Sequence, residues 1–324
     1  MTTFKLGYAI DQWKPQFDDF VRRRDHERAL KTIAIAGFSG VQLTAGTGRW
    51  QPLGNPQQLE ANFGSADGFG DFVRSCALEA VAAYVVDPGQ GFHEDLSHGA
   101  DARSPANRDA VVATCGWFAQ AVARTGGDIL VCRPAPSGAA GKADDAAIKA
   151  LAECWNTVGR ATAELGVTTT LRFDFLSCLR LADGWDRLLA ALDPALVGLA
   201  LDTGELAAAG RDPLAEIERS PLPLRHVILS NARATDELDE FTRPGAEFTV
   251  RQSGGQRGIP RWFGELEEPG LVDPAAVLAA LGRLGYGGWV VVNTAPSPHP
   301  ATSALLSGYH LHQILLPALA GSAS

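Results

Sequence analysis

Short apolar runs alternate with longer stretches that have one apolar face along almost the whole chain. Most of the short runs are continuously hydrophobic rather than alternating, which is typical of parallel strands covered on both faces. Eight segments have this character, and we expect each to be a β-strand: 4–10, 40–44, 79–86, 128–133, 167–174, 197–202, 224–230 and 288–293.

Amphipathic stretches of helical period fill the intervals between these strands. The expected helices are 26–36, 68–77, 107–125, 144–165, 184–192, 213–217, 274–284 and 302–316. Their ends carry local signals, because Gly37, Gly166 and Gly285 each follow a last helical turn. Asp273 before Pro274 has the residue types of a helix cap and a first helical position.

Eight strand–helix units in 324 residues predict an α/β fold of the (β/α)8 TIM barrel type. A doubly wound open sheet is the alternative, but no glycine-rich turn follows the first strand. No linker or change in composition divides the chain, so we expect one domain over residues 1–324. Two long inserts, 46–63 and 232–270, follow the second and seventh strands, and loops of this length are usually functional lids.

Composition and charge narrow the class of protein. The chain is 46% hydrophobic and 20% charged, which is ordinary for a soluble globular protein. A net charge of −9 without a basic run argues against nucleic-acid binding, and no run is long and apolar enough to span a membrane. Five widely spaced cysteines and an N-terminus without a signal-peptide core predict a cytoplasmic protein.

The most informative segment is Gly198-Leu199-Ala200-Leu201-Asp202-Thr203-Gly204-Glu205. It predicts a buried strand that ends on one carboxylate, followed by a tight turn and a second carboxylate. In barrels the carboxyl ends of the strands carry the chemistry, so Asp202 and Glu205 are candidate catalytic residues. The alternative is that Asp202 only caps the following helix.

Several segments together resemble the sugar phosphate isomerase/epimerase family, the xylose isomerase-like barrels. They are Ala36-Gly37-Phe38-Ser39-Gly40-Val41-Gln42-Leu43, Asp202-Thr203-Gly204, Ala209-Gly210-Arg211-Asp212-Pro213, Arg225-His226-Val227, and the segment from Val272 to Val292. These pieces span nearly the whole chain, and the resemblance implies the same barrel fold.

The resemblance also implies a divalent metal, which in the family is held by a Glu after strand five, an Asp closing strand six, a His in strand seven and a Glu closing strand eight. Here the Asp is kept as Asp202, whereas the other positions fall on Arg180, Ile228 and Asn293. A His that the family often has three residues after the Asp falls on Glu205. Isoleucine offers no ligand and arginine brings a positive charge, so we expect no metal and no other cofactor.

A guanidinium group is our candidate replacement for the metal. Arg172 and Arg180 flank the fifth strand, Arg133 closes the fourth, and arginine binds carboxylates and other oxygen pairs through its planar fork. Arg172 and Asp174 should face the same side of the strand, because side chains two residues apart do so. Asp174, Asp202 and Glu205 would supply a general acid and a general base. The alternative is that these groups form internal salt bridges only.

Other polar and aromatic residues at expected strand ends are candidates for substrate binding. They are Trp13, Trp50, Tyr84, His93, Ser230 and Asn293, in addition to Arg133. The aromatic residues could form an apolar wall of the pocket, although core packing explains them equally well.

Three functions remain open at this point. The leading one is a metal-independent isomerase, epimerase or lyase that moves a proton next to a carbonyl of a small polyhydroxylated or carboxylated molecule. The second is a metal-dependent sugar isomerase with ligands such as Asp174, Asp202 and Glu205. The third is a barrel that binds a ligand without catalysis. The partner in each case is a small molecule, and the resemblance also allows a homodimer.

Overall fold

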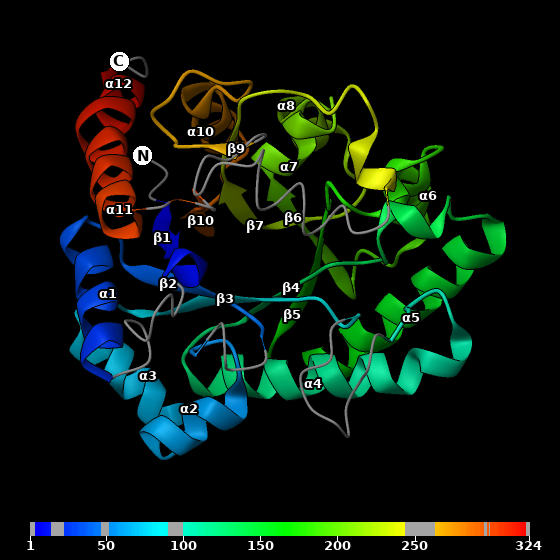
Figure 1. Cartoon of the computed structure of the whole chain (residues 1–324), viewed down its shortest axis with the longest axis horizontal. Coiled ribbons are helices and arrows are strands. Elements are labelled where there is room, and N and C mark those ends of the chain that lie inside the picture. Colours follow the sequence, from blue (N-terminus) through cyan, green and yellow to red (C-terminus); the bar gives the residue numbers. More distant parts are fainter. Residues whose placement is uncertain are drawn as a thin grey trace.

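A closed barrel of eight parallel strands forms the centre of the computed structural model, with helices around it (Figure 1). The structure describes residues 4–13, 23–46, 52–89, 100–243, 263–294, 297 and 299–321. The strands follow one another around the barrel in the order β1-β10-β7-β6-β5-β4-β3-β2. The prediction of a (β/α)8 barrel is therefore confirmed, and the open sheet is ruled out.

Each barrel strand lies within one of the eight apolar runs of the sequence. The strands are β1 (Lys5–Ala9), β2 (Gly40–Thr44), β3 (Ala80–Val86), β4 (Ile129–Cys132), β5 (Thr168–Arg172), β6 (Val197–Asp202), β7 (Leu224–Leu229) and β10 (Trp289–Val292). Almost all of their residues are buried, since side chains on one face fill the barrel and those on the other contact the helices. This double burial explains why the runs are continuously apolar.

The helices cover the outside of the barrel. They are α1 (Arg23–Ile35), α2 (Pro56–Phe63), α3 (Ala66–Ser75), α4 (Arg108–Arg124), α5 (Asp145–Ala163), α6 (Gly184–Ala191), α7 (Thr203–Ala208), α8 (Pro213–Arg219), α10 (Pro274–Arg283), α11 (Pro300–Tyr309) and α12 (Leu316–Gly321). A π-helical turn, His310–Leu315, joins the last two. None of the described helices is long and apolar enough to cross a bilayer.

Helix ends follow the local signals in the sequence. Asp273 caps α10 by accepting the N–H groups of Ala275 and Ala276, and Pro274 is the first helical residue. Gly37, Gly166 and Gly285 have φ angles of 93°, 73° and 70°, a left-handed conformation that costs glycine little.

The amino end of the barrel is plugged by side chains. Trp289 packs so closely over Gly40 that any β-carbon there would overlap the indole ring. One layer higher, His226 on β7 and Gln42 on β2 meet at 2.8 Å, although β1 and β10 separate their strands in the barrel wall. The pair therefore spans the interior. Burial lowers the pKa of His226 to about 3, so this histidine is neutral.

A short antiparallel pair, β8 (Asn231–Ala232) and β9 (Phe263–Gly264), brings together the two ends of the insert that follows β7. Part of the predicted 232–270 lid lies outside the described residues, so the lid stays a prediction. The insert after β2 contains α2, which the sequence analysis did not predict. Its start has a clear signal, because Asn55 caps it and Pro56 follows.

Candidate active site

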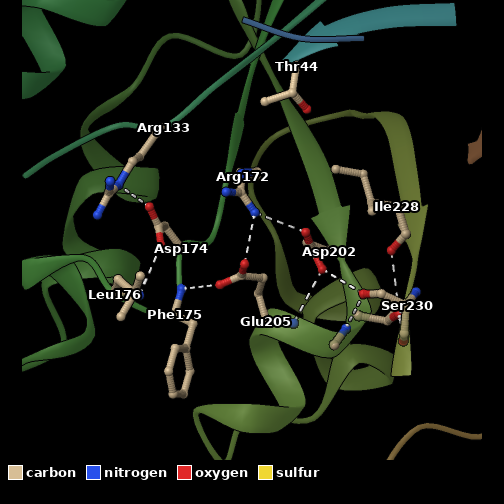
Figure 2. A network of polar contacts seen from close by, with 12 residues as sticks. Thr44, Arg133, Arg172, Asp174, Phe175, Leu176, Asp202, Glu205, Ile228 and Ser230 are labelled. Atoms are coloured by element: carbon tan, nitrogen blue, oxygen red, sulfur yellow. Dashed lines mark hydrogen bonds and ion pairs between the residues drawn. The ribbon is translucent and has the colours of Figure 1, made fainter. Parts of the chain in front are cut away.

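The carboxyl ends of β5 and β6 place a cation between two carboxylates. Arg172 and Asp202 are the last residues of these neighbouring strands, and Glu205 lies in the first turn of α7. Nη1 of Arg172 is 3.0 Å from Oδ2 of Asp202 and 3.3 Å from Oε1 of Glu205 (Figure 2). All three side chains are buried.

Asp202 accepts hydrogen bonds on both oxygens. Oδ1 accepts the Ser230 hydroxyl at 2.8 Å and the Glu205 N–H at 3.2 Å, while Oδ2 accepts Arg172. Asp202 is thus both the cap of α7 and part of the polar cluster. A role as helix cap and a role as candidate catalytic residue are therefore compatible. Burial and the nearby charge of Glu205 raise the pKa of Asp202 to about 6, although Arg172 and Ser230 act in the opposite direction.

Glu205 is held by the loop after β5. Its Oε2 accepts the backbone N–H of Phe175 at 2.6 Å (Figure 2). A carboxylate that accepts a backbone N–H and faces a guanidinium is fixed in orientation, with its second oxygen on the Arg172 side. Phe175 was not among the residues that the sequence suggested.

Arg172 has donors that these contacts do not use. Burial disfavours its charged form, but the charges of Glu205, Asp174 and Asp202 outweigh that effect and raise its pKa, so the group stays charged. The hydrogen bond and ion pairs of its side chain with Asp202 and Glu205 all go through Nη1. Its Nε–H is buried and has no hydrogen-bond partner in the described part of the chain.

A second ion-pair cluster lies beside the first. Arg133, which follows β4, contacts Asp87 at 2.8 Å and also pairs with Asp174. Asp174 accepts the N–H of Leu176 at 2.9 Å as well. As Figure 2 shows, Asp174 turns toward Arg133 and Glu205 occupies the place next to Arg172. The acid–base candidates are therefore Asp202 and Glu205 rather than all three carboxylates.

Arg180, on which the resemblance places the family's Glu after strand five, lies apart from the cluster of Arg172, Asp202 and Glu205. The strand ends at Arg172, and Arg180 lies in a 3₁₀ turn, Cys178–Arg180, beyond it. Its guanidinium pairs with Asp236 at 3.0 Å and lies over the ring of Phe241. Arg180 thus contacts the segment after β7 and not Asp202 or Glu205.

The candidate substrate-binding residues have different positions. Ser230 contacts Asp202, and Asn293 directly follows β10. Tyr84 was wrongly assigned, because its fully buried hydroxyl donates to the Leu53 carbonyl and its ring packs on Phe118 of α4. Trp13 is half-buried and meets the Tyr8 ring edge-on. The remaining two, Trp50 and His93, lie outside the described residues.

The side chains at these strand ends do not fit the divalent metal that the resemblance to the xylose isomerase-like barrels implies. The residues at or next to the ends of β5, β6, β7 and β10 are Arg172, Asp202, Ile228 and Asn293, and Asp202 and Ile228 are direct neighbours in the sheet. They offer one carboxylate and one amide, with a guanidinium already bound to the carboxylate. Among the described residues, no three Asp, Glu, His or Cys side chains come together in a way that could hold an ion.

Fold and site together define a (β/α)8 barrel with a buried polar cluster at the carboxyl ends of its strands. A sequence model of the xylose isomerase-like TIM barrel family matches residues 30–308, and the chain belongs to that family.

The relatives of this chain include dehydratases. The inosose dehydratase of Clostridium beijerinckii is 27% identical over 150 residues, which are 46% of this chain and 48% of that protein. The inosose dehydratase of Geobacillus kaustophilus is 27% identical over 155 residues, 47% of this chain and 48% of that protein. The chain thus spans about half the length of the curated relatives it matches.

Solved structures extend the likeness in fold over the whole barrel. The probable 3-DHS dehydratase AsbF of Bacillus anthracis has a TM-score of 0.69 and 11% identity, with 95% of this chain and 98% of that chain covered. An L-ribulose 3-epimerase has a TM-score of 0.67 and 15% identity, with 99% and 97% covered. At such identities the likeness concerns the fold alone.

Proposed function

We propose that this protein is a lyase of the dehydratase type, or an isomerase or epimerase, that takes a proton from the carbon next to a carbonyl of a polyhydroxylated molecule. Arg172 takes the role that a divalent metal has in other members of the family, and Asp202 and Glu205 move the proton. The contact of Arg172 with both carboxylates at the ends of β5 and β6 is the observation that carries this proposal.

Charge balance supports an acid–base role for the carboxylate pair. One guanidinium faces two carboxylates, so the group of Arg172, Asp202 and Glu205 has one surplus negative charge in a buried place. A bound proton removes this surplus, which agrees with the raised pKa of Asp202. Two coupled carboxylates that share one proton can accept and donate it near neutral pH.

Arg172 is suited to stabilise the oxygen of the reacting carbonyl. When a carbon next to a carbonyl loses a proton, negative charge moves to the carbonyl oxygen and an enolate forms. In the proposed mechanism the N–H donors of Arg172 that the carboxylates do not use donate to that oxygen, while Nη1 stays on the carboxylates. In this proposal Glu205 accepts the proton, while Asp202, which accepts hydrogen bonds on both oxygens, holds Arg172 in place.

The second half of the reaction decides its class. If the enolate expels a hydroxide from the next carbon and an acid protonates the leaving oxygen, the product is water and an unsaturated ketone. If the proton returns to carbon on the other face, the product is an epimer. We favour dehydration, because the relatives with the higher sequence identity carry the name inosose dehydratase.

The test is incubation of the purified, metal-stripped protein with inososes and with keto sugars in D₂O. Deuterium at the carbon next to the carbonyl, or release of water with a new ultraviolet absorbance of an enone, supports the proposal. Activity that appears only after a divalent ion is added contradicts the role of Arg172 and favours a metal-dependent isomerase. Tight ligand binding without exchange or turnover favours the non-catalytic alternative.

A further inference from the structure

Phe175 connects the candidate active site with a region outside it. Its backbone N–H donates to Oε2 of Glu205 at 2.6 Å. Its ring points away from Arg172 and Asp202 (Figure 2) and is fully buried. The ring meets the guanidinium of Arg180, with 4.9 Å from Cζ to the ring centroid, and the ring of Phe263 edge-on at 5.8 Å between centroids.

Arg180 is itself fixed on the far side of this ring. Its Nη1 contacts Oδ2 of Asp236 at 3.0 Å, and its Nη2 donates to the Asp236 backbone carbonyl at 3.0 Å. The Phe241 ring lies 4.1 Å from its Cζ. Asp236 also accepts the N–H groups of Glu240 and Phe241, so this segment after β7 has a defined shape.

Phe175 and Arg180 together contact both ends of the insert that follows β7: Arg180 contacts Asp236 and Phe241, and Phe175 contacts Phe263. Asp236 and Phe241 precede residues 244–262, and Phe263 follows them. The backbone that follows Phe175 in the loop after β5 is fixed independently. The Gly138 N–H donates to the Leu176 carbonyl at 2.7 Å, and Ser137 forms a β-bridge with Ser177. Arg180 therefore restrains the ring of Phe175, while other contacts restrain the backbone that follows it.

We propose that Arg180 is a positioning residue that keeps the Phe175 N–H directed at Glu205. This inference rests on the proposed function, in which Glu205 accepts the proton. A hydrogen bond to the charged form of a carboxylate favours that form. Loss of the restraint should weaken this hydrogen bond and displace Glu205, and small displacements of reacting groups are costly to the rate.

The kinetic test uses two variants. Arg180→Met combined with Asp236→Asn removes both charges, which avoids leaving a buried carboxylate without its partner, and Arg180→Lys keeps the charge but loses the planar group. We expect the double variant to lower kcat by about 10- to 100-fold with little change in KM. Arg180→Lys should have an intermediate kcat.

A double-mutant cycle tests the path through the ring. Phe175→Leu removes the ring and keeps the backbone N–H. If Arg180 acts through this ring, the effects of Phe175→Leu and of the Arg180 change are not additive. Additive effects would contradict the proposed path.

A measurement without substrate separates this inference from the proposed function. The chain has 14 phenylalanines, so ¹⁵N-phenylalanine labelling gives a simple amide spectrum, in which Phe175 is assigned by its loss in Phe175→Leu. A short hydrogen bond to a carboxylate moves an amide proton downfield, so we expect a downfield Phe175 signal in the native protein. In the double variant the signal should move upfield.

Arg211→Met is the matched control. Arg211 is another partly buried arginine that binds carboxylates, Asp186 and Glu216, and lies over a phenylalanine ring, that of Phe173. The Arg211→Met variant should lose stability without moving the Phe175 signal or lowering kcat. An unchanged Phe175 signal in a folded double variant would overturn the inference. A shifted signal in a protein without any turnover would leave it standing and defeat only the proposed function.

Discussion

At the scale of single residues, the candidate active site depends on one cation that touches two carboxylates. A guanidinium has five N–H donors in a fixed plane, so Arg172 can hold Asp202 and Glu205 through one nitrogen and still present others. Lysine has the same charge without this geometry. Geometry rather than charge is therefore the property to test first.

Replacing Arg172 by lysine should lower kcat of the proposed reaction by about 100- to 1000-fold, the cost typical of losing a donor to a developing oxyanion. Steady-state kinetics on the most active hydroxy ketone checks this expectation. Arg233→Lys is the control, because Arg233 forms an exposed ion pair with Glu268 and should keep normal activity. Normal turnover in Arg172→Lys would show that the fork is not needed.

The raised pKa of Asp202 predicts how stability depends on pH. The pKa rises from an ordinary value of 3.8 to about 6, so between these values the folded state binds more protons than the unfolded state. This contribution to stability is complete below about pH 4 and is lost as pH rises through about 6. Two pKa units correspond to about 3 kcal/mol.

Asp202→Asn lacks this titration. The difference in free energy of unfolding, variant minus native protein, should therefore be about 3 kcal/mol more positive at pH 8 than at pH 4. Urea unfolding curves of both proteins at a series of pH values measure the difference. Parallel pH dependence in the two proteins would mean that Asp202 is ionised throughout.

At the scale of elements, close contacts between strands and side chains decide which small residues are essential. Gly40→Ala places a methyl group against the Trp289 ring inside the barrel and should destabilise the protein by about 1–3 kcal/mol. Gly116→Ala, in the middle of α4 with open space around it, should instead stabilise by about 0.5–1 kcal/mol. Denaturant unfolding of both variants compares them, and equal effects would contradict the packing argument.

The barrel strands could be predicted from sequence because burial on both faces leaves a strong signal, continuous apolar runs. The end of a strand is harder to place. The sequence analysis took the run 167–174 as a strand and placed the family's Glu position after that strand on Arg180. In the structure the β-ladder ends at Arg172. Extended residues that lack a partner strand look the same in sequence as those that have one.

The candidate site was predictable only in part, for a related reason. Asp202 and Glu205 are marked by their residue types at a strand end, and both lie in the site. Phe175 contributes a backbone N–H, which every residue except proline has, so no residue type marks it. The partners of Arg180, such as Asp236 and Phe241, lie more than fifty residues away in an insert without a repeating pattern.

At the scale of the whole molecule, the proposed function predicts indifference to chelators. Overnight dialysis against EDTA, followed by metal analysis, should change neither the thermal midpoint nor the turnover on the best substrate, because no donor set among the described residues fits a structural or catalytic ion. A clear drop in both, restored by one divalent ion, would contradict the proposal. A metal-dependent member of the family, treated in parallel, shows that the chelation is effective.

The positive charge of Arg172 is part of the polypeptide chain, whereas a metal ion has to be bound after synthesis. This charge cannot dissociate, be exchanged for a competing ion or change its oxidation state. If Arg172 has the proposed role, the activity of the protein should stay constant through a shortage of divalent metal ions.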